Sequence, residues 1–323
     1  MRIGIYLDLR NPPEWRRPWP DFYRQSLDLA VQAEEWGADS VWLSEHHFFE
    51  DGYLPQPLTF AAAVAARTRR VRIGTAVVLA PLRPALQIAE EAAVVDQISG
   101  GRLDLGLGAG YVHDEFEAFG ADLSRRFTTT DRRVREVREL LEGGRVTPPP
   151  VQSPFPIWLG YNGPQGARRA GRLGCGLLSI NPASVAPYFE GLAEGGHPPT
   201  EARMAGVAWM VVADDPDEAY ERILPHLAWQ LNTYQAARVA GTGKTPSPLT
   251  VEVLRERRIT SGIIPPLEVF TPEDAIEYLR SRAEGMPMVE AYCWASIGGM
   301  PDDLARRHAE LLCTTVREGV ADL

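Results

Sequence analysis

The sequence predicts one α/β domain folded as a (β/α)8 TIM barrel, and three observations lead to that fold class. Short apolar segments alternate with segments of helical periodicity eight times along residues 1–323. No linker of distinct composition divides the chain. Its composition, 45% apolar and 24% charged, is ordinary for one large globular core. Strand–helix units in this order form a parallel sheet with right-handed connections, which closes most simply as a barrel.

The first half of the chain carries the clearest patterns. Residues 21–36 have helical spacing of Leu27, Ala30 and Val31, and Gly37 is placed to end that helix. The segment 71–79 is a strongly apolar strand. The strands predicted in this half are 3–7, 40–44, 71–79 and 102–107, and the helices are 21–36, 58–66, 84–97 and 124–142.

The second half repeats the alternation less regularly. Its predicted strands are 157–159, 176–180, 205–212 and 288–294, and its helices are 165–173, 184–193, 216–240 and 301–318. Residues 147–156 are rich in proline and are expected to be a surface connection. Residues 241–271 are too long for a plain loop, and they include Ile263-Ile264-Pro265-Pro266. They are expected to form an insertion, either a lid over the site or a passive surface excursion.

Charge and composition exclude several classes of function. A net charge of −10 argues against a general nucleic-acid-binding or anionic-membrane-binding surface. The three cysteines are odd in number and form no C-x-x-C motif, which fits a reducing compartment. The N-terminal apolar run stops at Asp8, and no apolar stretch reaches the length of a membrane span. We expect a cytoplasmic protein.

The sharpest polar feature is Glu45-His46-His47, which follows the second predicted strand. Catalytic residues of these barrels lie at the carboxyl ends of the strands. Neighbouring residues on a strand point in opposite directions, so the two histidines cannot share one role. A core histidine is usually structural, but this position favours function for at least one of them.

No metal site is expected. A metal would need histidine or carboxylate ligands from several strand ends. His197, His226 and His308 lie in a loop or in predicted helices, and only His113 is near the barrel mouth. The single lysine, Lys244, lies in the insertion and cannot bridge two metals from a strand.

Two glycine-containing segments follow later strands. Gly106, Gly108 and Gly110 do not match the Rossmann dinucleotide motif, and small residues there leave room for a bulky group at the barrel mouth. Gly160-Tyr161-Asn162-Gly163 precedes a predicted helix, where backbone N–H groups can bind a phosphate.

At this point the chain resembles the bacterial-luciferase-like superfamily. The resemblance is close over residues 1 to about 180, and the later part matches in order and length only. The matching segments are VWLSEHHF (41–48), IGTAVVL (73–79), DQISGGR (96–102), EF and FG (115–116 and 119–120) and PIWLG (156–160).

The resemblance implies a barrel that binds reduced FMN or the deazaflavin F420. His46 matches the family's active-site histidine, with Glu45 beside it, and the Ala76–Val77 bond matches a non-prolyl cis peptide behind the flavin ring. The residues expected to bind the cofactor are Ala76, Val77, Gly108, Ala109, Tyr111, Gly160, Tyr161, Asn162 and Gly163, the last four at the phosphate.

One departure from the family concerns the phosphate. Ala109 stands where bacterial luciferase has an arginine that reaches the phosphate. Phosphate binding must then depend more on backbone donors, or on Arg168 or Arg169.

Three functions are compatible with these residues. The first is a two-component monooxygenase that receives reduced FMN from a separate flavin reductase and uses O2 on a small organic substrate. Phe48, Tyr111, Trp209 and Trp294 would then help to exclude water, and His46 would act as general acid or base because an imidazole exchanges a proton near neutral pH. The second is an F420-dependent dehydrogenase or reductase, and the third is a flavin-binding relative without turnover. A homodimer is left open.

Overall fold

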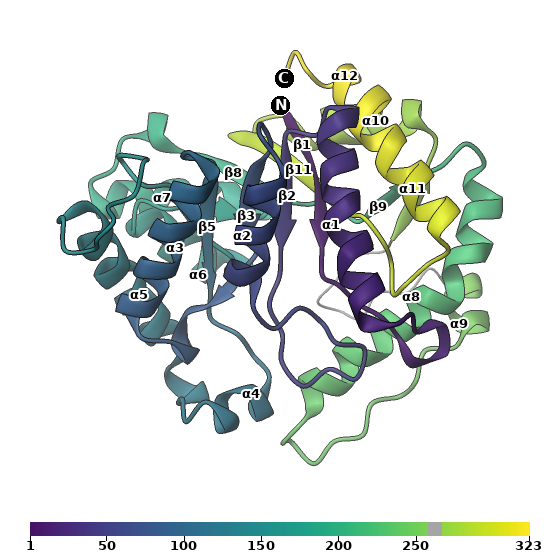
Figure 1. Ribbon diagram of the computed structural model, residues 1–323, viewed down its shortest axis with the longest axis horizontal. Helices are drawn as coiled ribbons and strands as arrows, with labels where there is room; N and C mark the ends of the chain where they lie inside the picture. Colours follow the sequence, from purple (N-terminus) through teal and green to yellow (C-terminus); the bar gives the residue numbers. More distant parts are fainter. Residues whose placement is uncertain (258–266) are drawn as a thin grey trace.

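The computed structural model describes residues 1–257 and 267–323 and confirms the predicted barrel (Figure 1). Its strands are β1 (Arg2–Leu7), β2 (Ser40–Leu43), β3 (Arg72–Thr75), β4 (Val78–Leu79), β5 (Leu103–Gly108), β6 (Ile157–Leu159), β7 (Gly176–Leu178), β8 (Met204–Val207), β9 (Met210–Val212), β10 (Glu268–Phe270) and β11 (Met288–Trp294). Parallel pairing runs in the order β3-β2-β1-β11-β8-β7-β6-β5-β4, and a β3–β5 pairing closes the ring. Because β3 and β4 are two halves of one strand, eight strand positions form the barrel.

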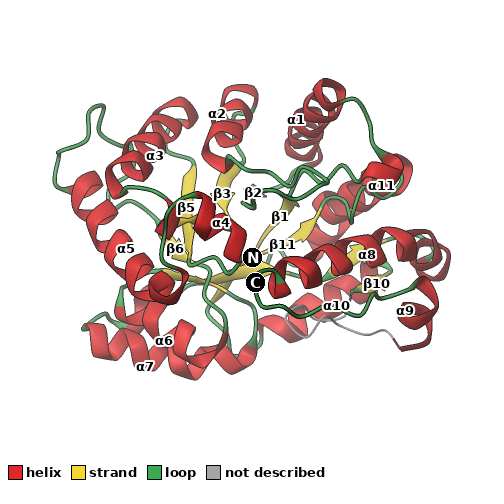
Figure 2. Ribbon diagram, turned by 90° about the horizontal axis from the view of Figure 1, so that it is seen from below, coloured by secondary structure: helices red, strands yellow, loops and turns green. Residues whose placement is uncertain are grey.

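Helices surround this ring of strands (Figure 2). They are α1 (Trp19–Trp36), α2 (Pro57–Arg67), α3 (Ala85–Ser99), α4 (His113–Ala118), α5 (Arg126–Glu142), α6 (Gly163–Arg172), α7 (Val185–Gly195), α8 (Pro216–Val239), α9 (Val251–Arg257), α10 (Pro272–Ala283), α11 (Asp302–Leu311) and α12 (Arg317–Gly319). The two termini lie at the end of the barrel opposite α4 (Figure 1). In the described part of the chain, no helix is both long and apolar enough to cross a bilayer.

Aromatic side chains fill the barrel interior. Trp42 stacks on Tyr292 with ring centroids 4.7 Å apart, and Trp158 meets Trp42 edge-on at 6.1 Å. The indole N–H of Trp42 donates to Glu290 at 2.5 Å, and that of Trp158 donates to Asp104 at 3.1 Å. Because large rings with hydrogen-bonded polar atoms pack the interior, the barrel around these rings is a solid core and not a channel.

The third strand is interrupted where the sequence predicts one continuous strand over 71–79. The Ala76–Val77 peptide bond is cis, which confirms that prediction, and it separates β3 from β4. The Tyr6 hydroxyl donates to the Ala76 carbonyl at 2.9 Å. Ala76 and Val77 lie outside the regular strand pairing, and they form part of the barrel mouth.

The strand predicted over 205–212 is also divided, and it forms two short strands, β8 and β9. The segment β8 pairs within the barrel, whereas β9 pairs with β10 in a separate two-stranded sheet. Trp209 lies between the two halves and packs on Trp294, with ring centroids 4.1 Å apart. The division therefore places an indole ring at the barrel mouth.

The insertion contains regular structure within its described residues. It contributes α9 and β10, and residues near Leu249 fold back on α8 through two hydrogen bonds between Leu249 and Asn232. The predicted Ile263–Pro266 feature lies outside the described residues. Helix α10, which follows, was not predicted. Its N-cap is Thr271, whose side chain accepts a hydrogen bond from Asp274 N, and threonine is a common N-cap residue.

His308 links the barrel to the separate sheet and sets a pH dependence of stability. Its buried ring accepts from Val212 N at 2.9 Å through Nδ1 and donates to the Trp294 carbonyl at 3.0 Å through Nε2. Burial lowers the pKa of His308 from 6.5 to about 4. Between those pH values the unfolded chain binds a proton that the folded chain does not, so stability present above pH 6.5 is lost as pH falls toward 4.

We expect the thermal midpoint to fall across that window. A His308→Gln variant should be less stable at neutral pH and should show a shallower decline, because the titrating ring is gone. Thermal unfolding at constant ionic strength measures both slopes. Equal slopes would assign the acid sensitivity to other groups.

Candidate active site

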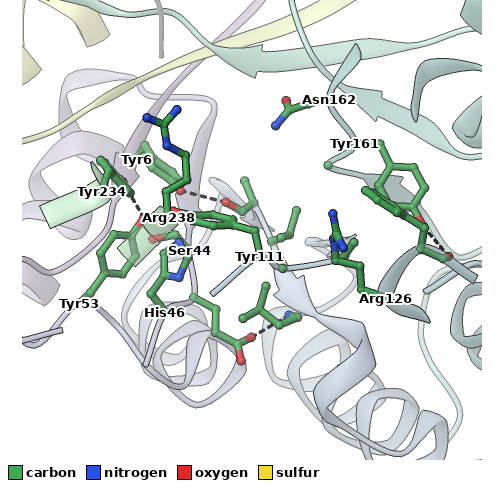
Figure 3. A pocket seen from close by; sticks show the side chains of 18 of the residues that line it. Tyr6, Ser44, His46, Tyr53, Tyr111, Arg126, Tyr161, Asn162, Tyr234 and Arg238 are labelled. Carbon is green, nitrogen blue, oxygen red and sulfur yellow. Dashed lines mark hydrogen bonds between the residues drawn. The ribbon is translucent and has the colours of Figure 1, made fainter. Parts of the chain in front are cut away.

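A cavity of about 340 Å³ opens at the carboxyl ends of the barrel strands. Figure 3 shows side chains from several strands and helices converging on it. Its aromatic lining residues are Tyr6, Tyr53, Tyr111, Phe127, Tyr161, Trp209, Tyr234 and Trp294. A second cavity of about 640 Å³ adjoins it and shares Ala76, Val77, Gly160, Asn162, Trp209 and Trp294 with it. Because the two cavities share these residues, a single extended ligand could occupy both of them.

His46 is held at this cavity by Glu115, a buried residue of α4. His46 Nδ1 lies 2.8 Å from Glu115 Oε1, which also accepts from His47 N at 2.8 Å. Because a carboxylate accepts hydrogen bonds, this pairing assigns the proton to Nδ1 and leaves Nε2 able to accept one. The rings of Tyr53 and Tyr111 lie 4.8 and 5.3 Å from the imidazole.

The second oxygen of Glu115 is also informative. Glu115 Oε2 is buried and has no hydrogen-bond partner among the described residues. A buried unpaired carboxylate oxygen is costly and is often kept for a functional reason. The sequence match around Glu115-Phe116 pointed to this segment without assigning a role to the carboxylate.

Glu45, expected to be catalytic beside His46, lines the cavity and is anchored by hydrogen bonds to three neighbours. Its side chain is fully buried. Its oxygens accept from Leu79 N at 2.9 Å, from Arg83 Nη1 at 2.8 Å and from His47 Nε2 at 2.9 Å. A carboxylate with these three partners is committed to holding strand ends together. His46 and His47 lie in the loop after β2 rather than on a strand, and their rings have different partners, Glu115 for His46 and Glu45 for His47.

A cluster that the sequence analysis missed attaches α8 to the cavity. Arg10 donates to Asp51 at 2.7 Å and to Thr233, and its guanidinium lies 5.0 and 4.9 Å from the rings of Tyr53 and Tyr234. The hydroxyls of Tyr53 and Tyr234 are 3.1 Å apart. These partners are too far apart in sequence for any local pattern to pair them.

The structure brings most of the predicted cofactor residues together. Those that line one or both cavities are Ala76, Val77, Ala109, Tyr111, Gly160, Tyr161, Asn162 and Gly163. Gly108 lines neither cavity, and a Cβ there would overlap the Val77 side chain. Gly108 leaves room for the Val77 side chain, and its contact with the cofactor stays a prediction. Tyr161 contributes its ring, while its hydroxyl donates outward to Asp131 at 2.9 Å.

Helix α6 begins at the edge of the second cavity, where the sequence predicts the phosphate position. Its first residue, Gly163, has φ of 73° and lines that cavity. Its N-cap, Asn162, makes no side-chain capping hydrogen bond. The first amides of this ten-residue helix are therefore not capped by the Asn162 side chain.

The two arginines suggested for the phosphate are engaged elsewhere. Arg168 is paired with Glu194 on the outer surface, and Arg169 donates to Asp131 at 2.6 Å. Instead Arg126, at the start of α5, lines the first cavity. Sequence reasoning missed Arg126 because only the tertiary structure brings α5 beside the loop that follows β6.

Residue positions also bear on the expected aromatic lining and on possible metal ligands. Tyr111, Trp209 and Trp294 line the cavity as predicted, but Phe48 does not, since it is 71% exposed with φ of 64°. Among the described residues, the three potential metal ligands that lie together are His113, Asp114 and Glu117, all exposed on α4. An exposed acidic group of this kind is common without an ion and gives no argument for a metal.

Comparison with known proteins places the chain among oxidoreductases. A model of the luciferase-like monooxygenase family matches residues 1–258. An F420-dependent glucose-6-phosphate dehydrogenase from Amycolatopsis mediterranei is 33% identical over 191 residues, 52% of this chain and 57% of that protein. The alkanal monooxygenase alpha chain of Photorhabdus laumondii is 31% identical over 131 residues, 41% of this chain and 36% of that protein.

Among solved structures, the monooxygenase RslO1 from Streptomyces bottropensis superposes with a TM-score of 0.78 at 26% identity. That match covers 100% of this chain and 99% of the other. The two curated relatives, by contrast, are matched over less than two thirds of their own lengths. Their names include both a monooxygenase and an F420-dependent enzyme.

Proposed function

The chain belongs to the luciferase-like monooxygenase family, and from that premise we propose that it is a flavin-dependent monooxygenase. In this proposal it receives reduced FMN from a separate reductase and, with O2, oxygenates a small organic substrate. The observation that carries it is the aromatic cavity at the strand ends, with His46 held by Glu115 at its wall. The likeness to RslO1, which is named a monooxygenase, supports the same reading.

The residues present fit a phosphorylated flavin. The start of α6 and Arg126 offer backbone and guanidinium donors to a phosphate. Val77 stands in the wall shared by the two cavities and presents an apolar surface suited to a ring system. Reduced FMN, when bound, supplies the electrons with which O2 is reduced and one oxygen atom is transferred.

The chain's own residues supply binding, water exclusion and proton handling. The rings of Tyr6, Trp209 and Trp294 pack together at the cavity wall and keep that side dry. Glu115 fixes the orientation of His46, so that Nε2 accepts or returns the proton that the reaction requires. Glu45 holds Leu79 and Arg83 beneath the site.

An F420-dependent dehydrogenase or reductase is the second candidate. It is favoured by the 33% identity with an F420-dependent dehydrogenase over 52% of this chain. The same cavity and the same histidine would then serve hydride transfer, with His46 taking or giving the substrate proton.

Anaerobic titration separates the two candidates. Purified protein is titrated with reduced FMN and, separately, with F420, and binding is followed by absorbance. Tight binding of reduced FMN, followed by consumption of O2 after mixing with aerobic buffer, is the expected result. Binding of F420 alone would replace the proposal with the second candidate, and binding of neither would remove both.

The α6 phosphate position makes a separate prediction. A Cβ at Gly163 would meet no atom within 4 Å, so a larger side chain there enters the open space of the cavity. We expect Gly163→Leu to weaken binding of reduced FMN by about tenfold or more, because a charge-assisted hydrogen bond is worth 1.5–3 kcal/mol, or roughly a factor of ten to a hundred.

Gly196 provides a matched control. It has a similar φ of 76° and equally open surroundings, but it ends α7 away from both cavities. Gly196→Leu therefore reproduces the backbone strain without entering the site. Equal FMN affinities in the two variants would show that the phosphate binds elsewhere.

A further inference from the structure

We propose that the substrate of this site is an aromatic molecule with a neutral hydroxyl group, a phenol, and that this hydroxyl binds between Ser44 and His46. The inference rests on the proposed function only in calling the bound molecule a substrate. It names the substrate class and adds Ser44 to the site as a specificity-determining residue.

The first step is the unpaired hydroxyl of Ser44. Ser44 directly follows β2, lines the first cavity and is 2% exposed. Its Oγ is buried and has no hydrogen-bond partner in the described part of the chain. No other described residue that lines this cavity has a buried side-chain polar atom in that condition. Because an unpaired buried hydroxyl costs free energy, it marks a place where a bound molecule completes the hydrogen bonding.

The second step is the arrangement of the neighbouring hydroxyls. Tyr6 donates its hydroxyl proton to the Ala76 carbonyl at 2.9 Å. Burial raises the pKa of the Tyr6 phenol, and the nearby hydroxyls of Ser44 and Tyr53 oppose that rise. The Tyr53 hydroxyl lies 3.1 Å from that of Tyr234. The three tyrosine hydroxyls thus have protein partners, whereas Ser44 Oγ, although near Tyr6, makes no hydrogen bond among the described residues.

The third step is the group that His46 offers beside Ser44. Nδ1 of His46 is paired with Glu115, so Nε2 accepts a proton and does not donate one. Figure 3 shows Ser44 and His46 on the same side of the cavity. A ligand group that meets both must accept from the Ser44 hydroxyl and donate to His46 Nε2. A hydroxyl does both, whereas a carbonyl or carboxylate oxygen only accepts.

The fourth step is the charge of the two cavities. Four described residues that line them carry a charged side chain, and these are Glu45, Arg126, Arg238 and Arg282. Glu45 is held by three donors. Arg126 donates to a backbone carbonyl, Arg282 donates to a tyrosine hydroxyl, and Arg238 also has a partner. Since each of these ions is already engaged, the group still to be paired beside His46 is a neutral one, and a neutral hydroxyl pairs it without burying a further charge.

The fifth step is the shape of the cavity around Ser44 and His46. The rings of Tyr53 and Tyr111 lie 4.8 and 5.3 Å from the His46 imidazole, each close to perpendicular to it. Aromatic rings gain extra stabilisation from edge-to-face and offset contacts with other rings. The surroundings of the hydroxyl position therefore favour a planar aromatic body, which makes the hydroxyl a phenolic one.

A phenol also suits the chemistry of the proposed function. One oxygen atom of O2 forms a bond to a ring carbon ortho or para to the hydroxyl, the C–H bond of that carbon breaks with release of a proton, and a proton completes the new hydroxyl. The other oxygen atom becomes water with two electrons and two protons from the reduced flavin. His46 Nε2 takes the phenol proton while the new bond forms, which makes those ring carbons electron-rich, and returns it afterwards.

Calorimetric titration of the full chain under anaerobic conditions, with and without reduced FMN, tests the inference. The probes are 2-naphthol, 2-naphthaldehyde and 2-methylnaphthalene, which differ in one substituent. The wild type is expected to bind 2-naphthol more tightly than either of the others by about threefold or more, since a net hydrogen bond is worth roughly two- to tenfold. Ser44→Ala should weaken 2-naphthol binding by about three- to tenfold and leave 2-methylnaphthalene within about twofold. It should also keep or raise the thermal midpoint, because it removes an unpaired buried hydroxyl.

Ser99→Ala is the matched control. Ser99 is buried as well, but its hydroxyl donates to the Asp96 carbonyl at 3.0 Å, away from both cavities. This variant should lower the midpoint and leave all three affinities unchanged. A wild type that binds 2-naphthaldehyde or 2-methylnaphthalene as tightly as 2-naphthol would overturn the inference. Equal losses for 2-naphthol and 2-methylnaphthalene in Ser44→Ala, or no loss for either, would do the same.

The two proposals fail separately. Loss of flavin binding with intact, Ser44-dependent binding of 2-naphthol would remove the monooxygenase assignment and leave the hydroxyl site. Normal flavin binding without a preference for 2-naphthol would remove the hydroxyl site and leave the monooxygenase assignment.

Discussion

Replacement of His46 by asparagine is expected to lower turnover by about a hundredfold or more, while the barrel stays folded and keeps most of its cofactor affinity. Asparagine can retain a hydrogen bond to Glu115 but cannot take up or return a proton. The effect is large because His46 is the imidazole that the structure places at the cavity wall, with Nδ1 paired to Glu115 and Nε2 left for chemistry.

Turnover and thermal midpoint should be measured on the same sample of the His46→Asn protein. Oxidation of reduced flavin coupled to NADH consumption provides the assay. If His46 only supports the fold, the midpoint drops and the surviving folded protein keeps normal specific activity. That outcome would contradict the catalytic assignment, whereas an unchanged midpoint with lost turnover supports it.

Replacement of Glu45 by glutamine is expected to destabilise the fold by about 3–5 kcal/mol, the usual cost of breaking a buried ion pair. Glutamine has nearly the same shape but no charge. It would leave Arg83, whose side chain is only 4% exposed, without its carboxylate partner. It would also weaken the contacts to Leu79 and His47.

Denaturant unfolding of Glu45→Gln measures this loss, with Glu194→Gln as the control. Glu194 pairs with Arg168 on the surface, where both side chains are partly in solvent. Removing that pair should change the free energy of unfolding by less than about 1 kcal/mol. A Glu45→Gln protein as stable as the control variant would show that Glu45 is not the anchor described above.

The fold was predictable because its signals are local. Alternating apolar segments and helical periods set the eight strand–helix units, and the N-terminal half matches them closely. The strand predicted at 157–159 coincides with β6, and Gly37 ends α1 in the left-handed conformation expected of it. The resemblance to the luciferase-like family further predicted the cis bond between Ala76 and Val77, which the structure contains.

Local patterns were less informative where a strand leaves the sheet. The segments 71–79 and 205–212 are mostly apolar, so nothing in their periodicity marks the break at Ala76–Val77 or the departure of β9 toward β10. Both breaks depend on partners from other parts of the chain. Helix α10 is a different case, because its Thr271 cap is a local signal that the sequence analysis passed over.

The sequence by itself determined the barrel, and it pointed to the carboxyl ends of the strands and to His46 as the candidate site. The tertiary structure alone decided which groups those residues meet. Glu115 is 69 residues from His46, and Tyr234 is 181 residues from Tyr53. Side-chain direction at a strand end depends on which donors the fold brings near, and so Glu45 became an anchor. For the same reason Arg126 and Arg238, from helices distant in sequence, both line the cavity.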